Sequence, residues 1–495
     1  MTESSRSPVI SVIIPTHNRC ATLKRTLDAL SRQTYPSGQM EIIVVADGCR
    51  DDTLEMLRRY QLSLPLSIIE QESQGAAAAR NRGAAQARGS LLLFLDDDVV
   101  PRPGLVEAHV ALHCKQCGQV GIGPYLPAEN SSHSYFHSKV RNWWKAKFFE
   151  LQQPDHRFSY QDLLSGNLSM EADTFARIGG YNTDPIFQAH EDYELGIRLI
   201  KSQVAFRFVS AAVGDHYETI NLRRTLERAR QEGRADVTIG QQYPELRSTL
   251  PLVTSLKSMK LRYRAVLIIF PLLWSTFGNV LSNISMRGLR GLEILRLTCY
   301  WNQLYSFLHW YWYWWGVIER LKNWRNIAVF VQERKAELSK DELIVEINLE
   351  EGLEQAKQFL DEKKPSGLKI GYGKHLVGFI APQPGFEPLN GSHLYSIITK
   401  TLAVSFLEAL ALEDVVGPPN IVDRQKLADS ITAKANWFGP PLLSQMWYEQ
   451  YSQWNNLQNT KAKKMESPHN RADALSTQSK KINYPVVYSE KSHEK

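Results

Sequence analysis

The stretch "SLLLFLDDDVVPRPG", residues 90–104, joins a run of apolar residues to three adjacent carboxylates. The apolar part, 91–95, is typical of a strand that is buried on both faces of a sheet. Three ionised carboxylates at one point repel one another and resist desolvation, so Asp96, Asp97 and Asp98 require positive charge nearby. The stretch therefore predicts a buried strand that ends at a charged site.

Strand and helix patterns alternate on the amino-terminal side of this stretch. Continuous apolar, β-branched runs predict buried strands over 9–15, 41–47 and 66–70. Leu23, Leu27 and Leu30 recur with helical spacing, and "GAAAARNRGAAQARG" (75–89) predicts an Ala-rich helix. Such alternation gives a mostly parallel α/β sheet with helices on both faces. Ligands of such sheets bind beyond the carboxyl ends of the strands, which is where Asp47 and the three acids fall.

Residues 121–220 are less regular, but "HEDYELGIRLIK" (190–201) predicts a helix that begins near Glu191. On this helix Asp192, Leu195 and Leu199 share one face. Asp192 is therefore expected to point inward with the apolar side chains.

Carboxylates on a loop favour a hard divalent cation, Mg²⁺ or Mn²⁺. A nucleotide diphosphate is the natural partner of such an ion, because the metal neutralises it as a leaving group. A solvated acidic turn is the alternative explanation of the three acids taken alone.

The totals fit a globular, multidomain chain. Its 495 residues suggest about two to four domains, and the net charge of +6 is too mild to indicate nucleic acid. Five cysteines fit a reducing compartment better than a disulfide scaffold. The start "MTESSRSPVI" contains no apolar stretch typical of a secretory signal.

Seven segments resemble, in order and spacing, the family 2 glycosyltransferases. They are "SVIIPTHNR" (11–19), "VVADGCRDDT" (44–53), "GAAAARNRG" (75–83), "LFLDDD" (93–98), "SGNLSM" (165–170), "GGYNTD" (179–184) and "HEDYELGIRL" (190–199). The resemblance covers about residues 9–220. It implies a glycosyltransferase A-type fold and an enzyme that transfers a sugar from a nucleotide-diphosphate sugar to an acceptor hydroxyl with inversion.

The resemblance also implies roles for individual residues. The residues that would bind the donor are Pro15, Thr16, Asp47, Arg80, Asp96 and Asp97. Asp98 would hold the metal, together with Asp96 and His216. Asp192 would be the catalytic base, and Glu191 would help to position the acceptor. Many members have two acids where this chain has Ala46 and Asp47. A packed histidine at 216, a helix-surface arginine at 80 and a helix N-terminal acid at 192 are the structural alternatives.

The implied cofactor is Mn²⁺ or Mg²⁺, the implied donor a nucleotide sugar (a UDP-sugar first), and the acceptor a glycan or lipid-linked molecule in polysaccharide, glycolipid or other glycoconjugate synthesis. Two rival classes remain. A sugar-phosphate nucleotidyltransferase would need a Gly-rich loop after the first strand, where this chain has "PTHNR". A non-catalytic nucleotide-sugar-binding or scaffold protein would keep the fold without transfer.

Composition suggests four parts: a catalytic domain (1–245), a helical, aromatic-rich, membrane-associating region (246–335), a C-terminal domain of unknown function (336–460) and a disordered basic tail (461–495). The uncharged stretches 265–286 and 297–318 contain polar residues and "WYWYWW" (310–315). These features favour helices that lie in a membrane interface over true spans, at the cytoplasmic face of the cell membrane. A buried helical packing surface with no membrane is the alternative. The arginines 223, 224, 228, 230 and 234 would form either a solvated helix face or a lipid-binding one.

Overall fold

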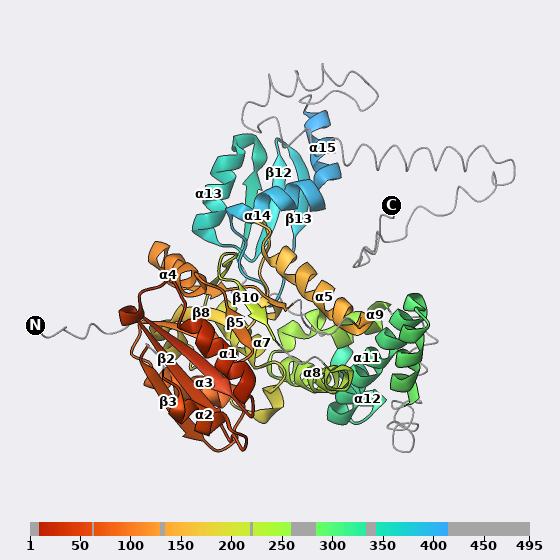
Figure 1. The fold of residues 1–495 in the computed structure, drawn as a ribbon. Helices are drawn as coiled ribbons and strands as arrows, with labels where there is room; N and C mark the ends of the chain where they lie inside the picture. The colour runs from red at the N-terminus through yellow and green to blue at the C-terminus, as the bar shows by residue number, and fades with distance from the viewer. Residues whose placement is uncertain are drawn as a thin grey trace, which may run out of the picture. The chain divides into compact units, whose positions relative to one another are not determined.

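The computed structural model describes residues 9–61, 64–128, 134–217, 221–258, 284–332 and 343–413. Its central element is a seven-stranded sheet in the order β3-β2-β1-β4-β8-β6-β9 (Figure 1). The strands are β1 (Ile10–Thr16), β2 (Met40–Asp47), β3 (Leu66–Gln71), β4 (Leu91–Leu95), β6 (Gln119–Ile122), β8 (Asn167–Glu171) and β9 (Ala205–Phe208). The first four run parallel, and β8 is antiparallel to both β4 and β6. The predicted mostly parallel α/β fold is confirmed.

Burial on both faces explains the continuous apolar runs of the first strands. Along β2, Ile42 and Val44 join the main hydrophobic core, whereas Ile43 and Val45 pack with Ala79 on the opposite face. This alternation follows from the two-residue period of a strand. All residues of β2 are buried, including Glu41 near its amino end, whose carboxylate bonds to Ser11 and Arg88.

Helices cover both faces of the sheet. They are α1 (Cys20–Leu30), α2 (Thr53–Arg59), α3 (Ala76–Gln86), α4 (Leu105–Lys115), α6 (Ala172–Arg177) and α7 (Glu191–Lys201). Leu23, Leu27 and Leu30 of α1 are wholly buried, as their spacing predicts. The small residues of α3 allow it to lie close to the sheet, since a Cβ at Gly83 would come within 2.5 Å of the Ile13 Cγ2.

A second, three-stranded sheet lies beyond the end of β4. It contains β5 (Val99–Pro101), β7 (Tyr125–Pro127) and β10 (Gly214–His216), with β10 in the middle. His216 pairs with Val99 in the antiparallel register of β10 and β5. This register brings His216 next to the third acid of the triplet, 118 positions away in sequence.

The described part of the chain up to 332 also contains α5 (Tyr135–Leu151), α8 (Leu222–Gln242), α9 (Pro251–Ser258), α11 (Thr298–Leu321) and α12 (Trp324–Val331), and residues 284–294 are helical as well. Helix α11 packs along α8 (Figure 1). Its Trp301 and Trp314 are almost wholly buried. Much of the stretch 297–318 therefore packs within the protein, in large part against α8, and its association with a membrane stays a prediction. Residues 265–283 of the other uncharged stretch lie outside the described residues.

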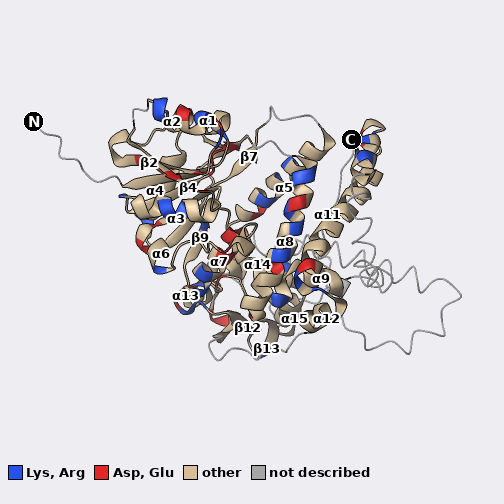
Figure 2. Cartoon of the chain, turned by 90° about the horizontal axis from the view of Figure 1, so that it is seen from below, with Lys and Arg blue, Asp and Glu red and all other residues tan. Residues whose placement is uncertain are grey.

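No helix in the described ranges has both the length and the apolar character needed to cross a bilayer. Several segments of the α8 ribbon are coloured as Lys or Arg positions (Figure 2). Arg230 and Arg234 both pair with Glu319 of α11, whereas Arg223 and Arg228 pair with acids one turn along α8. Four of the five arginines singled out in the sequence thus have carboxylate partners within the protein.

The chain after 343 contributes to two compact units. Its elements are β11 (Ile344–Asn348), α13 (Leu353–Lys363), β12 (Gly367–Tyr372), β13 (His375–Ile380), α14 (Gly391–Ser396) and α15 (Ala403–Leu412), and the strands form a three-stranded sheet in the order β11-β12-β13. Lys357–Lys369 and Phe379–Leu394 belong to the first unit with the chain up to Glu346. Ile347–Ala356, Ile370–Gly378 and the described residues from Tyr395 form the second.

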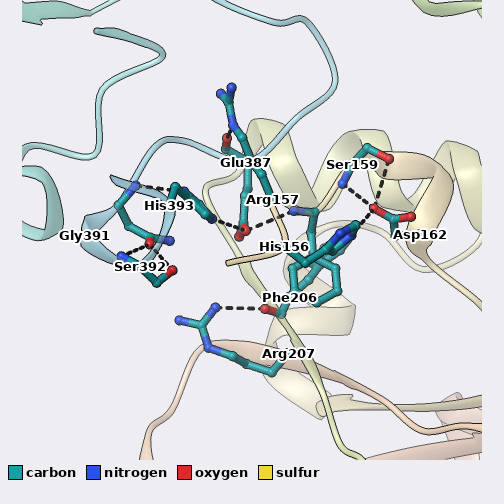
Figure 3. Close-up of polar contacts among 12 residues, drawn as sticks. His156, Arg157, Ser159, Asp162, Phe206, Arg207, Glu387, Gly391, Ser392 and His393 are labelled. Atoms are coloured by element: carbon teal, nitrogen blue, oxygen red, sulfur yellow. Dashed lines mark hydrogen bonds and ion pairs between the residues drawn. The ribbon is translucent and has the colours of Figure 1, made fainter. Parts of the chain in front are cut away.

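Polar contacts tie the segment 379–394 into the first unit (Figure 3). Arg157 donates through Nε to the Glu387 carbonyl oxygen at 2.8 Å. The Glu387 carboxylate in turn accepts from the Phe158 backbone N–H at 3.1 Å and lies 3.4 Å from the His393 Nε2. The sequence-based domain boundaries stay predictions, but this segment packs with the amino-terminal part of the chain.

Candidate active site

The three acids at the end of β4 point to different partners. Asp97 accepts a hydrogen bond from the Thr16 hydroxyl at 2.7 Å, which joins the ends of β1 and β4. The Arg19 guanidinium pairs with Asp97 at 3.2 Å and also with Asp98. Arg19 therefore supplies part of the positive charge that we expected near the three acids.

Asp96 belongs to a second ion-pair group. The buried Arg80 of α3 contacts the Asp96 Oδ1 through Nη2 at 2.8 Å and the Glu191 Oε1 through Nη1 at 3.2 Å. Its guanidinium also lies 5.3 Å from the centre of the Tyr181 ring. Arg80 is thus a buried link between the ends of β4 and α7, and the helix-surface alternative does not apply.

His216 lies beside Asp98, with 3.3 Å between its Nε2 and the Asp98 Oδ1. Both side chains are buried. Aromatic rings surround the imidazole: that of Tyr125 is 5.5 Å away and that of Trp144, on α5, is 6.5 Å away between ring centres. Asp98 and His216 together present oxygen and nitrogen donors at one point of the site.

Burial and neighbouring charges shift the pKa values of Asp97 and Asp98 in opposite directions. Burial raises the pKa of Asp97 to about 7; Arg19 opposes this shift, and the charge on Asp98 adds to it. Burial would also raise the pKa of Asp98, but the His216 hydrogen bond and the charges of His216 and Arg19 hold it below its usual range. Asp98 is therefore the acid of this pair that keeps its charge most firmly.

Asp192 lies in the first turn of α7, where the sequence placed it. Its Oδ1 accepts from the Tyr193 backbone N–H at 2.9 Å, and its Oδ2 accepts no hydrogen bond within the described part of the chain. Burial, followed by the charge of Glu191, raises the pKa of Asp192 to about 7, while His190 and Arg228 act in the opposite direction. A carboxylate with this proton affinity is suited to accept a proton near neutral pH.

Asp47 has a structural task at the end of β2. Its Oδ1 accepts from the Gln71 side chain at 2.8 Å and the Gln74 backbone N–H at 2.7 Å, and its Oδ2 accepts from the Gly75 N–H at 2.9 Å. These bonds fix the loop that leads into α3. Pro15 lies within β1 opposite Val45. Their contact with a donor stays a prediction.

Sequence reasoning missed Arg19, Tyr125 and Gly166. A Cβ at Gly166 would lie 2.9 Å from the Asp96 Oδ2 and 3.0 Å from the Tyr125 hydroxyl oxygen, so glycine is needed where these two side chains approach. The need for positive charge could have pointed to Arg19, which ends the "PTHNR" segment. Tyr125, on the short β7, carries no such signal.

Other metal-binding candidates do not assemble. Cys114 and Cys117 are free and exposed, and His109 hydrogen-bonds to Ser169 and Asn167 in the interior. Among the described residues, no group of three or more His, Cys, Asp or Glu side chains is arranged to hold a metal by itself.

Comparison with known proteins finds two family models that match parts of this site. The model described as glycosyl transferase family 2 matches residues 11–177, and one described as the N-terminal domain of galactosyltransferase matches residues 147–221. Residues 11–177 form a family 2 glycosyltransferase domain. This family 2 domain contains Arg19, Arg80 and the three acids of β4, and the second match contains Glu191, Asp192 and His216.

Relatives of the family 2 domain differ in what they act on. The chain is 34% identical over 220 residues to a validoxylamine A glucosyltransferase of Streptomyces hygroscopicus subsp. jinggangensis, covering 40% of this chain and 52% of the relative. It is 40% identical over 110 residues to glycosyltransferase AglE of Haloferax volcanii, covering 22% and 36%. The chain thus spans about half the length of the glucosyltransferase and about a third of the length of AglE.

Among solved structures, the chain is similar to a mannosyltransferase from Pyrobaculum calidifontis in complex with GDP-Man and Mn²⁺. The sequence identity is 16% and the TM-score 0.40, with 64% of this chain and 88% of that chain covered.

Proposed function

We propose that this protein is an inverting glycosyltransferase that moves a sugar from a nucleotide-diphosphate sugar to an acceptor hydroxyl in glycoconjugate synthesis. The observation that carries the proposal is Asp192. Its Oδ2 accepts no hydrogen bond within the described part of the chain, its pKa is raised to about 7, and its neighbour Glu191 is linked to Asp96 through Arg80. The family 2 match supports sugar transfer as the reaction class.

Single displacement requires one base and one stabilised leaving group. The acceptor oxygen forms a bond to the anomeric carbon while its proton passes to the Asp192 Oδ2. The bond between that carbon and the diphosphate oxygen breaks, and the diphosphate leaves with the electron pair. Glu191, fixed by Arg80, would orient the acceptor beside Asp192. No second carboxylate needs to attack the sugar, so the configuration inverts.

Positive groups of the chain face the place where the diphosphate charge would develop. Arg19 and Arg80 lie on the acids of β4, and each would help to stabilise the leaving phosphates. Thr16 and Asp47, at the ends of β1 and β2, would border the nucleotide base. A UDP-sugar is the first candidate donor, and a glycan or lipid-linked molecule is the expected acceptor.

The three predicted ligands do not assemble into a metal site by themselves among the described residues, so a divalent cation here would have to be shared with substrate. Asp98 and His216 offer an oxygen and a nitrogen at one point, and Asp96 has a partly exposed carboxylate. Mg²⁺ and Mn²⁺ commonly take a few protein ligands and complete their shell with phosphate oxygens and water. Asp98, Asp96 and His216 would hold the ion, which when bound would neutralise charge on the diphosphate.

Contact with a membrane surface is supported by one exposed region. Ile294 and Leu295 are 81% and 67% exposed, and the nearby Arg287, Arg290 and Arg296 are also exposed. Apolar and basic side chains together favour anionic lipid surfaces, and the cytoplasmic face of the cell membrane is such a surface. Flotation with anionic vesicles but not with neutral ones would support this placement, and flotation with neither would contradict it.

Ligand-dependent thermal unfolding tests the proposed function. UDP, GDP, dTDP and CDP would each be added with Mn²⁺ and with a chelator, because a ligand of the folded state raises the unfolding temperature. We expect a shift with one diphosphate that disappears with chelator, followed by transfer from the corresponding nucleotide sugar to give a product of inverted configuration. Binding without transfer to any acceptor would favour the non-catalytic alternative, and a retained configuration would exclude single displacement.

A further inference from the structure

Three buried polar side chains meet at the start of α7: one from the residue that precedes this helix, one from α8 and one from α11. His190 immediately precedes α7, and its Nε2 lies 3.1 Å from the Asp236 Oδ1 on α8. The other Asp236 oxygen accepts from the Tyr313 hydroxyl of α11 at 2.5 Å. The His190 Nδ1 lies 2.7 Å from the Ala189 carbonyl oxygen, so both ring nitrogens face acceptors. This arrangement needs hydrogen on both nitrogens, as in an imidazolium.

The charges around the His190 ring agree with this assignment. Burial lowers its pKa, but the Asp236 hydrogen bond and charge, with Glu232 of α8 and Asp192 of α7, raise it to about 9. The Tyr193 ring stacks on the imidazole with centres 4.4 Å apart. His190 thus carries a positive charge at neutral pH, between an acid of α8 and the first turn of α7.

That charge is one of several that face Asp192. Glu191 raises the proton affinity of Asp192, whereas His190 and Arg228 of α8 lower it. The phenolic side chains of Tyr125, Tyr181 and Tyr193 also interact with the Asp192 carboxylate. His190 and Arg228 therefore oppose the rise in the Asp192 pKa that burial causes. His190 is held in place by Asp236 of α8, which in turn bonds to Tyr313 of α11.

We propose that His190 is a positioning residue for the proton-accepting carboxylate. Held by Asp236 and Tyr313, it fixes the first turn of α7 and stabilises Asp192 in the ionised form that can accept a proton. The α8–α11 helix pair, which also carries Arg228, thereby takes part in the reaction. This inference rests on the proposed function of Asp192.

The pH dependence of kcat/KM in His190→Gln tests the electrostatic part. Loss of a neighbouring positive charge makes the ionised carboxylate less stable, so the acidic limb should move to higher pH, by roughly one unit. The KM for donor should change little, because His190 does not face the acids of β4. His393→Gln is the matched control: His393 is buried and pairs with Glu387 at 3.4 Å, but is not among the charges assigned to Asp192. A lowered kcat with an unmoved acidic limb would overturn the proposal.

Histidine NMR provides a test that does not depend on activity. In the intact protein the His190 signals, assigned by their absence in His190→Gln, should be those of an imidazolium at pH 7.5. In Asp236→Asn they should be those of a neutral ring, because burial is then unopposed by its carboxylate partner. A neutral His190 in the wild type would overturn the inference even if transfer is confirmed. An imidazolium in a protein without transfer activity would leave the buried pair established and refute the proposed function instead.

Discussion

At the scale of single residues, the site is organised by where its counter-charges lie. Arg19 neutralises Asp97 and Asp98, while Arg80 neutralises Asp96 and Glu191. Asp192 has no arginine ion pair of this kind within the described residues, and burial together with the charge of Glu191 raises its pKa to about 7. Asp98 keeps its charge firmly, whereas Asp97 and Asp192, each with a pKa raised to about 7, lie at the edge of ionisation near neutral pH.

Asp192→Asn should therefore abolish transfer and leave donor binding nearly intact. An amide has almost the same shape but cannot accept the proton, and loss of a general base typically lowers kcat by about 10² to 10⁴. Steady-state kinetics and the nucleotide-induced unfolding shift would be measured on the same preparation. Turnover equal to that of the wild type would remove Asp192 as the base.

Arg19→Gln should destabilise the folded protein in the absence of metal. It leaves two buried carboxylates without their shared cation, and breaking a buried ion pair commonly costs about 3–5 kcal/mol. The Arg19 side chain is 39% exposed, so the loss should be smaller, about 2 kcal/mol after allowance for solvent screening.

Urea unfolding with and without Mn²⁺ would measure the Arg19→Gln effect, and Mn²⁺ should restore part of the loss. Arg58→Gln is the control, because its pair with Glu70 is exposed on both sides and should contribute little. Equal stability of Arg19→Gln and Arg58→Gln would show that Arg19 is not needed as a counter-charge.

At the scale of elements, the contact between α8 and α11 depends on two glycines. A Cβ on Gly233 would collide with the Tyr313 carbonyl oxygen, and a Cβ on Gly316 with the Arg230 carbonyl oxygen. The two backbones therefore touch at this crossing. The same crossing brings Tyr313 to Asp236, and Glu319 to Arg230 and Arg234.

Gly233→Ala should lower the free energy of unfolding by about 1–3 kcal/mol, the usual range for overpacking a tight contact. Gly291→Ala is the matched control. It also lies in a helical stretch, but a Cβ there meets no atom within 4 Å. Thermal unfolding of both variants would decide the matter; equal stabilities would mean that the helices separate easily at this point.

The same elements show what could be predicted from sequence. The strands ending at Thr16, Asp47 and Leu95 follow from continuous β-branched or apolar runs, and their parallel order brings their polar ends together. Arg80, Asp192 and His216 came from the family resemblance; Arg80 contacts Asp96 and His216 contacts Asp98, while the roles of all three stay predictions. Arg19 was missed because the demand for positive charge was assigned to a metal.

Helix α11 illustrates a limit of a different kind. Its aromatic run fits burial against lipid or against protein equally well, since both environments reward the same apolar area. The contact of α11 with protein is seen at Gly233 of α8 and Gly316 of α11, which lie 83 positions apart in sequence. The sequence does not show that these two glycines meet.

At the scale of the whole molecule, stability should depend on pH through its shifted groups. The pKa of His190 is raised to about 9, against about 6.5 in an unfolded chain. Its stabilising contribution is therefore complete below about pH 6.5 and is lost as the pH rises through 9. Asp192, with its pKa raised to about 7, acts with the same sign: its protonated form favours the folded state, and that contribution is lost as the pH rises through 7.

The free energy of unfolding should thus fall between about pH 6.5 and 9, by an amount on the order of 1–3 kcal/mol from His190. His190→Gln should fall less steeply over this range. Urea titrations at closely spaced pH values would measure both slopes, and identical slopes would contradict the assigned charge of His190.

The segment 379–394 has a consequence for how this protein is made. A ribosome delivers the chain from its amino terminus, yet Arg157 and Phe158 await partners on Glu387, more than two hundred residues later. The first unit is thus incomplete while the intervening residues are translated, and a nascent chain holds an unfinished domain throughout that time. At about 5–20 residues per second, the delay lasts roughly ten seconds or more. A protein truncated at residue 335 would lack Glu387, so Arg157 and Phe158 would never gain these partners.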